Sequence, residues 1–446
     1  MAEGGHVSGV ISGGIDMTHK ANKDVEPLSE ASPTAADAAR TKRLVAELRA
    51  VGAFEGEEQD RTRARAMVDI EGLVREWVES VYRRSEVPIP QEGGERRVML
   101  MVPFGSYCLG VHSGDSDIDV LAIVPKHVTR QAFLAELEPI LRQHPSVGTL
   151  HVVPESFVPV IKLVWDGVDI DLSCACLPLE AIPYPLDLTD SDFLKDLRDP
   201  KDVTCLNGPR VTYEILRRVR DVEAFRTVLR CIKMWARRRG IYSNIVGFPG
   251  GVAWAIMAAY VCQLYPHMDA SMLIDKFFFL YKNWNFESPV KIASIDECRA
   301  PQGAAYMAQW SQNAIVRAMQ IITPTYPVAN ATFNSCRSTV AVVKLEIEKA
   351  YGITQNVFLG KDHYSSLFTP VDFFQRYANY VAVECSAEDE ASLKPCYAYL
   401  ESQIRKLVER LESEYGVSLA HPCTEHFGPR RAEGGGGGGG GCFFLP

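Results

Sequence analysis

The chain has 446 residues, 47% of them hydrophobic and 23% charged, a composition typical of a globular protein of two or three domains. Its 47 lysines and arginines against 56 aspartates and glutamates give a formal net charge of −9, which excludes a protein that coats a polyanion over its whole surface. Twelve scattered cysteines without a C-x-x-C pair, no membrane-length apolar run and no apolar secretion signal favour a protein with reduced thiols in the cytosol or nucleus.

The first part of the chain predicts a tail, two helices and a mixed sheet. Residues 1–25 are glycine-rich and aperiodic, which predicts a disordered tail. Helical periodicity predicts one helix from about residue 33 to 54 and a second over 64–81. Strands are expected at 98–102, 118–124, 157–165 and 168–174, with a helix over 129–142 whose N-cap is Thr129. We therefore expect a small α+β domain built around a sheet.

The second part of the chain is mainly helical in pattern. Residues 225–239 place apolar side chains at helical spacing, and the surrounding 210–240 stretch holds ten Lys and Arg against three Asp and Glu. A helix over 252–265 is apolar all round, which predicts that it is buried. Residues 328–415 return to mixed strand and helix signals, and the last helix is expected over 395–415. The final segment, 421–446, contains eight consecutive glycines and is predicted to be disordered.

One stretch carries a recognisable chemistry. Gly105 and Ser106 directly follow a predicted strand, where a turn with free backbone N–H groups cradles phosphate. Asp117 and Asp119 are two residues apart at the start of the next strand, so both carboxylates lie on one face. A later strand repeats this spacing and adds Asp171 to the set.

Three carboxylates from two strands beside a phosphate-binding turn are typical of two-metal phosphoryl or nucleotidyl transfer. The alternative is a strand end that carries solvated acids. That alternative is reasonable for a single D-x-D pair, but the turn before it and the second acidic strand after it disfavour it.

The motifs Phe104-Gly105-Ser106, Asp117-Ile118-Asp119 and Asp171 resemble the nucleotidyltransferase signature of the DNA polymerase β superfamily. Longer flanking segments resemble the nuclear poly(A) polymerases of eukaryotes, and the similarity extends from about residue 26 to about residue 419. These segments are 109–112, 124–130, 157–162, 206–211, 232–238, 242–254 and 322–327.

The resemblance implies an α+β fold of three domains: a nucleotidyltransferase palm with a mixed sheet and helices, a helical middle domain and a ferredoxin-like or RRM-like C-terminal domain. The implied divisions are a tail at 1–25, an N-terminal segment of the middle domain at 26–63, the palm at 64–179, the middle domain at 180–327, the RNA-binding domain at 328–420 and a tail at 421–446.

The resemblance also implies the site residues. Asp117, Asp119 and Asp171 match the catalytic ligands of two Mg²⁺ or Mn²⁺ ions, with ATP as the substrate. The residues that match ATP contacts are Phe104, Gly105, Ser106, Ser113, Lys162, Asn207, Lys233, Tyr242, Asn244, Gly251, Val252 and Thr323.

The implied activity is template-independent addition of AMP from ATP to RNA 3′ ends in mRNA polyadenylation. The implied partners are the RNA 3′ end, ATP and the cleavage and polyadenylation factors, and the implied location is the nucleus, although the sequence has no clear import signal. Two alternatives stay open: a terminal transferase of another specificity, such as uridylyl transfer, and a non-catalytic RNA-binding relative.

Overall fold

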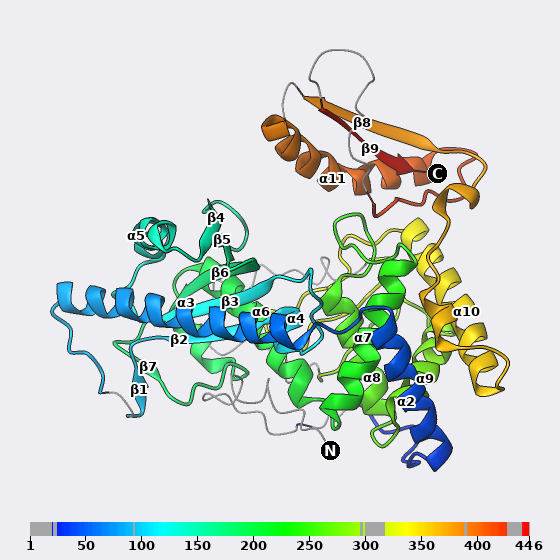
Figure 1. The fold of residues 1–446 in the computed structure, drawn as a ribbon, viewed down its shortest axis with the longest axis horizontal. Coiled ribbons are helices and arrows are strands. Elements are labelled where there is room, and N and C mark those ends of the chain that lie inside the picture. Colours follow the sequence, from blue (N-terminus) through cyan, green and yellow to red (C-terminus); the bar gives the residue numbers. More distant parts are fainter. Residues whose placement is uncertain are drawn as a thin grey trace.

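The structure, a computed structural model of the chain, describes residue 20 and residues 25–91, 94–294, 298, 317–387, 390–425 and 439–445. The tail expected at 1–25 falls almost entirely outside these residues. Figure 1 shows a sheet domain, a helical domain beside it and a small C-terminal unit above the helical domain. This architecture confirms the α+β fold class. No described helix is both long enough and apolar enough to cross a membrane.

The sheet domain is built on a mixed five-stranded sheet. Its strands lie in the order β2-β3-β6-β5-β4, and β3 and β6 run parallel while the other neighbours are antiparallel. The strands are β2 (Leu100–Phe104), β3 (Ile118–Val124), β4 (Val147–Val153), β5 (Val160–Trp165) and β6 (Val168–Cys176). A second ladder pairs β1 (Arg96–Arg97) with β7 (Ile182–Pro183). The sequence did not predict β4.

Different helices pack against the two faces of this sheet. Ile118 and Val120 point into a core shared with α3 (Glu57–Arg84) and α5 (Arg130–Gln143), and Thr129 caps α5 as predicted. Leu121, on the other face, packs in the core to which α6 (Pro200–Arg217) contributes. The short helix α4 (Gly105–Cys108) connects β2 to the segment that leads into β3.

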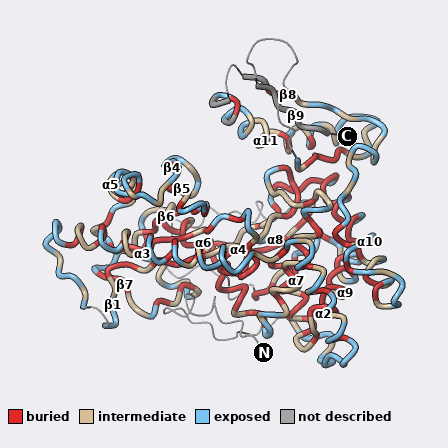
Figure 2. The backbone as a smooth tube through the Cα atoms, viewed as in Figure 1, coloured by how far each residue is buried: buried red, intermediate tan, exposed pale blue. Residues whose placement is uncertain are grey.

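The helical domain packs around one almost entirely buried helix. Figure 2 shows the buried backbone concentrated in this domain and in the sheet. The buried helix is α8, as its all-round apolar sequence predicted, and Trp254 on it meets Trp235 of α7 with ring centroids 5.7 Å apart. The helices of the domain are α2 (Ala35–Ala50), α7 (Val222–Arg238), α8 (Gly251–Leu264), α9 (Ala270–Lys282) and α10 (Arg337–Phe358). Short 3₁₀ helices are η1 (Asp192–Asp196), η5 (Tyr364–Phe368) and η6 (Phe373–Gln375).

Two helices pack across the domain divisions expected from the sequence. α6 falls within the range expected for the helical domain, but it packs on β2 and β6 of the sheet. α10 falls within the range expected for the RNA-binding domain, but it packs on α9. A hydrophobic pattern shows that a helix has an apolar face and does not show which partner covers that face, so the packing of these two helices could not be read from the sequence. The domain divisions themselves stay a prediction.

The C-terminal unit contains β8 (Val381–Ala387), α11 (Glu390–Ser413) and β9 (Gly439–Leu445). β9 pairs antiparallel with β8. The prediction of disorder throughout 421–446 is therefore wrong for β9, because a β-ladder is held by main-chain hydrogen bonds that glycine can make. A disulfide joins Cys385 to Cys396, so the expectation of reduced thiols fails for this pair.

Candidate active site

One row of residues crosses all five strands at the level of the acidic motif. The strand register pairs Phe104 with Asp119 and Asp119 with Asp171. It then pairs Asp171 with Lys162 and Lys162 with His151. Register partners on neighbouring strands point to the same face, so the sheet itself brings the acids and Lys162 together.

Asp117, Asp119 and Asp171 converge at this row. Each offers a carboxylate oxygen within 4.8 Å of the other two. Burial and the charges of Asp117 and Asp171 raise the pKa of Asp119 to about 7. Burial also raises the pKa of Asp171, against the opposing effect of its ion-pair partner Lys162. Like charges held this close are stabilised by a cation, so the cluster fits divalent metal ions.

The turn at Gly105 has a geometry that only glycine satisfies. Its φ is +62°, and a Cβ at this position would collide with the Asp119 carboxylate. The Gly105 N–H donates to the Thr212 hydroxyl of α6 at 3.1 Å, which fixes the turn to the helix that covers the sheet. Gly105 therefore lets the backbone approach one of the acids directly.

A cavity of 620 Å³ opens between the sheet and helices α7 and α8. It brings together most of the residues that the sequence predicted for the site. These are Gly105, Ser106, Asp117, Asp119, Lys162, Asp171, Lys233, Tyr242, Gly251 and Val252.

The side of the cavity opposite β5 carries positive charge. Lys233 is buried, and its ammonium donates to the Val111 carbonyl at 2.9 Å. Burial, together with Arg237 and Arg230, lowers the pKa of Lys233 to about 8. The Arg237 guanidinium lies 5.3 Å from the centre of the Tyr242 ring. This side of the cavity offers cations and a phenol to an anionic ligand.

Other predicted contacts do not line the cavity. Phe104 packs against Gly208 of α6, where a Cβ would lie 2.7 Å from the Phe104 ring. The Ser113 hydroxyl donates to the Asp115 carboxylate at 2.6 Å. Asn207 accepts from the Thr325 hydroxyl at 3.3 Å. Phe104, Ser113 and Asn207 thus lie around the cavity lining, and their contact with ATP stays a prediction.

Asn244 and Thr323 are also outside the lining. The Thr323 hydroxyl accepts from the Ala329 N–H at 2.9 Å and so stabilises its own turn. The Asn244 carbonyl accepts from Asn334 at 2.9 Å. The buried Asn244 side-chain oxygen has no hydrogen-bond partner within the described part of the chain. A role for either residue in ATP binding remains a prediction.

The sequence analysis did not name several polar residues that line the cavity as site residues: Asp115, Ser116, Thr149, His151, Asp169 and Arg237. Arg237 lies four residues after Lys233 on α7, so helical spacing could have found it. Thr149 and His151 lie on β4, which was not predicted, and no sequence signal indicated them.

Three family models match the chain in succession. They describe a poly(A) polymerase nucleotidyltransferase domain at residues 25–219, a poly(A) polymerase central domain at 224–370 and a poly(A) polymerase predicted RNA binding domain at 372–432. The central-domain match includes α10, in agreement with the packing of that helix on α9.

Curated relatives match over most of the chain. Poly(A) polymerase PAPalpha of Candida albicans is 38% identical over 92% of this chain and 73% of its own length. A poly(A) polymerase of Dictyostelium discoideum is 38% identical over 90% of this chain, and nuclear poly(A) polymerase 1 of Arabidopsis thaliana is 35% identical over 90%. The chain spans about half of these last two relatives, 49% and 56% of their lengths.

Solved structures share the fold at low sequence identity. A Cid1 poly(U) polymerase variant bound to MgATP superposes with a TM-score of 0.51 at 13% identity, over 74% of this chain and 98% of that one. A cytoplasmic RNA terminal U-transferase gives 0.50 at 14% identity, over 75% and 100%. These two structures support the nucleotidyltransferase fold.

Proposed function

The chain belongs to the poly(A) polymerase family of nucleotidyltransferases, and from this premise we propose that its cavity transfers AMP from ATP to the 3′ end of RNA without a template. The observation that carries the proposal is the convergence of three carboxylates, a glycine turn and a buried lysine in one cavity. A non-catalytic protein has no use for three clustered acids whose repulsion lowers its stability.

Asp117, Asp119 and Asp171 are the residues that would hold divalent cations, and we propose two Mg²⁺ or Mn²⁺ ions there. Among the described residues, Lys162 is the one cation that pairs with any of the three, so the cluster has more negative than positive charge. When bound, such ions lower the pKa of an attacking hydroxyl and neutralise charge on a triphosphate. The MgATP bound to the Cid1 variant supports this choice of ligand.

We place the triphosphate against α7 and α8. Lys233 and Arg237 supply positive charge there. Gly251 and Val252 form the first turn of α8, where unpaired N–H groups and the helix dipole favour an anion. A Cβ at Gly251 would lie 2.8 Å from the Tyr242 hydroxyl. Glycine at this position therefore leaves room for the Tyr242 phenol at this side of the cavity.

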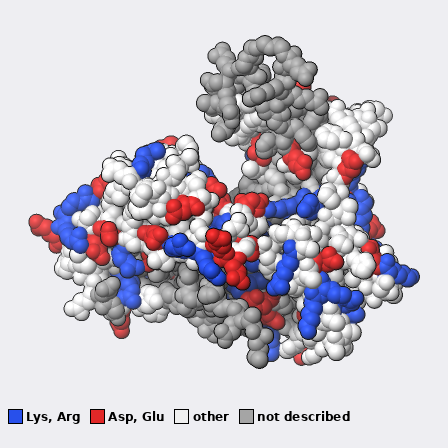
Figure 3. Space-filling view, viewed as in Figure 1, with Lys and Arg blue, Asp and Glu red and all other residues white. Residues whose placement is uncertain are grey.

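The RNA end then approaches over the other half of the sheet. Attack and departure lie in line in phosphoryl transfer, so with pyrophosphate leaving toward Lys233 the 3′-hydroxyl approaches from the side of β5 and β4. Asp171 and Lys162 lie on that side, and His151 lies next to Lys162. Figure 3 shows Lys and Arg interspersed with Asp and Glu on the face that it draws. Within the cavity, Lys162 and His151 are the groups on this side that can contact an RNA phosphate.

We also infer that the protein acts in the nucleus with cleavage and polyadenylation factors that select its RNA. The resemblance in sequence supports both inferences, and the Arabidopsis relative carries the word nuclear in its name.

The first test offers the protein one labelled nucleotide at a time with an RNA oligonucleotide and Mg²⁺ or Mn²⁺. We expect AMP to be added at least about tenfold more efficiently than UMP, GMP or CMP. An RNA that ends in a 3′-deoxynucleotide is the control, and it should not be extended. Preferential addition of UMP would replace this proposal by uridylyl transfer, and no addition of any nucleotide would favour a non-catalytic protein.

A second prediction concerns pH. Because burial and neighbouring arginines lower the pKa of Lys233 to about 8, its ammonium deprotonates above that pH and its attraction for phosphate is lost. We expect the KM for ATP to rise above pH 8, by up to about tenfold per pH unit, while the KM for RNA changes less. Steady-state kinetics between pH 7.5 and 9.5 measure both values.

The control is Lys233→Met, which keeps most of the length of the side chain and removes the titrating group. Its KM for ATP should be higher than that of the native protein and almost independent of pH. If the pH dependence persisted in Lys233→Met, another group would be responsible and Lys233 would lose its assigned contact.

A further inference from the structure

The basic stretch on α7 forms a ladder. Arg226, Arg230, Lys233 and Arg237 follow one another at intervals of four, three and four residues, which places them on one side of the helix. We call these four residues the cation ladder. The structure shows what the ladder faces: the segment 109–114, which we call the carbonyl segment, between α4 and the approach to Asp117.

Successive carbonyls of this segment accept hydrogen bonds from the ladder. Arg226 donates to the Leu109 carbonyl at 3.0 Å. Lys233 donates to the Val111 carbonyl at 2.9 Å. Part of the positive charge on α7 therefore forms hydrogen bonds with backbone carbonyls of the protein itself. Of the four residues of the cation ladder, Lys233 and Arg237 line the cavity.

Arg230 makes the largest number of these contacts. Its guanidinium donates to the carbonyls of Gly110 and His112, the latter at 3.1 Å, and to the Ala53 carbonyl at 3.2 Å. It also lies over the Phe54 ring, 4.6 Å from the ring centre. The two carbonyls of Gly110 and His112 flank Val111, so Arg230 holds both sides of the peptide that Lys233 contacts.

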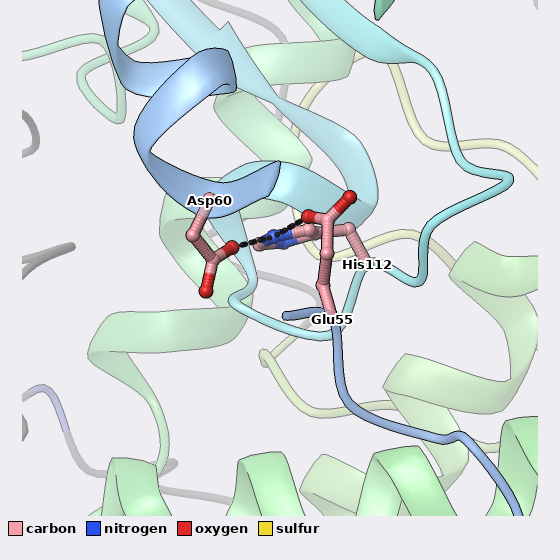
Figure 4. A group of neighbouring side chains, drawn as sticks. All are labelled: Glu55, Asp60 and His112. Carbon is pink, nitrogen blue, oxygen red and sulfur yellow. Dashed lines mark hydrogen bonds and ion pairs between the residues drawn. The ribbon is translucent and has the colours of Figure 1, made fainter. Parts of the chain in front are cut away.

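The opposite side of the carbonyl segment is anchored to the start of α3. Figure 4 shows the His112 ring between the carboxylates of Asp60 and Glu55, at 2.9 Å and 3.1 Å. Arg63 pairs with Glu55 at 2.9 Å and donates to the Gly114 carbonyl at 3.3 Å. Because Glu55 pairs with Arg63 as well as with His112, these four side chains form a network of ion pairs and hydrogen bonds. This network restricts the movement of the carbonyl segment.

We propose that Arg230 is a positioning residue, which fixes the carbonyl segment so that Lys233 meets the nucleotide triphosphate; this inference rests on the function proposed above. The ammonium of Lys233 has three donors. One is held by the Val111 carbonyl, and no described residue accepts from the other two, which can therefore donate to phosphate oxygens. If the Val111 carbonyl moves, the buried ammonium loses its partner and its placement in the cavity.

A double-mutant cycle tests this coupling. Arg230→Met keeps most of the side-chain volume and removes every donor. We expect it to weaken ATP binding about tenfold in the native background and less than about threefold in the Lys233→Met background, because Arg230 acts through Lys233. Displacement of a fluorescent ATP analogue at equilibrium measures the affinity in all four proteins.

Two further readouts separate positioning from a loss of stability. Since the charge of Arg230 lowers the pKa of Lys233, Arg230→Met should move the rise in the ATP KM to higher pH. Arg226→Met is the matched control, because Arg226 is also half-buried and donates to a single carbonyl of the segment. It should reduce ATP affinity less than Arg230→Met at a similar decrease in melting temperature.

An equal loss of ATP affinity in both backgrounds, or an unchanged affinity with a lower melting temperature, would overturn the inference. A failure of this inference can be distinguished from a failure of the proposed function, because the binding measurement does not require the protein to add nucleotides to RNA. If the native protein added UMP and not AMP, the proposed function would fail, and the same cycle with a UTP analogue would still decide the role of Arg230.

Discussion

Replacing Asp119 or Asp171 by asparagine is expected to abolish AMP addition while the protein stays folded. Each substitution removes one of three carboxylates whose oxygens lie within 4.8 Å of one another, and with it part of the site for divalent cations. The stabilisation that a metal ion gives to the charge of a phosphoryl-transfer transition state amounts to several kcal/mol, so we expect the rate to fall about a thousandfold or more. Single-turnover extension of a labelled RNA at saturating ATP measures this loss.

Asp169→Asn is the matched control. Asp169 lies two residues from Asp171 on the same strand face and lines the same cavity, but it is outside the cluster of converging carboxylates. We expect its rate to stay within about fivefold of native. Full activity in Asp171→Asn, or an equal loss in Asp169→Asn, would show that the cluster is not the metal site.

The Asp119→Asn variant also tests how the charge of Asp119 affects the stability of the fold. The folded-state pKa of Asp119, about 7, lies above the ordinary value of a carboxyl, about 3.9. The folded state therefore binds this proton more tightly than the unfolded chain does, and ionisation between pH 4 and 7 lowers stability. In metal-free buffer, Asp119→Asn should melt at a higher temperature than native at pH 8 and at the same temperature near pH 4.

Gly105→Ala is expected to have the second-largest effect on catalysis. The residue has a φ of +62°, and the added methyl group would meet the Asp119 carboxylate. The carboxylate has to move away from Asp117 and Asp171, so we expect the rate to fall at least about a hundredfold. A residue with a Cβ in this backbone region also costs about 1–2 kcal/mol of stability.

Gly167→Ala separates the two effects. Gly167 has a φ of +81°, but nothing lies within 4 Å of a Cβ added there. It should lose similar stability, measured by urea unfolding, and retain nearly native activity. If both variants lost activity equally, the loss would come from backbone strain and not from the displacement of Asp119.

The sequence determined the local part of this protein. Alternating apolar and acidic residues at Asp117, Asp119 and Asp171 predicted strands with acids on one face, and the structure places all three in one cavity. The apolar pattern of α8 predicted a buried helix, and Thr129 predicted the start of α5. These features depend on neighbours within a few residues, so spacing and residue type are enough to predict them.

The tertiary structure alone decided which distant segments meet. His151 reaches the site because β4 pairs with β5, and β9 exists because β8 offers it an edge. The sequence shows a concentration of positive charge on α7 but not what it contacts, and Arg230 donates to the carbonyls of Gly110 and His112. Such choices depend on which groups are left buried without a partner once the chain has folded, and contacts between residues more than a hundred positions apart leave no local pattern in the sequence.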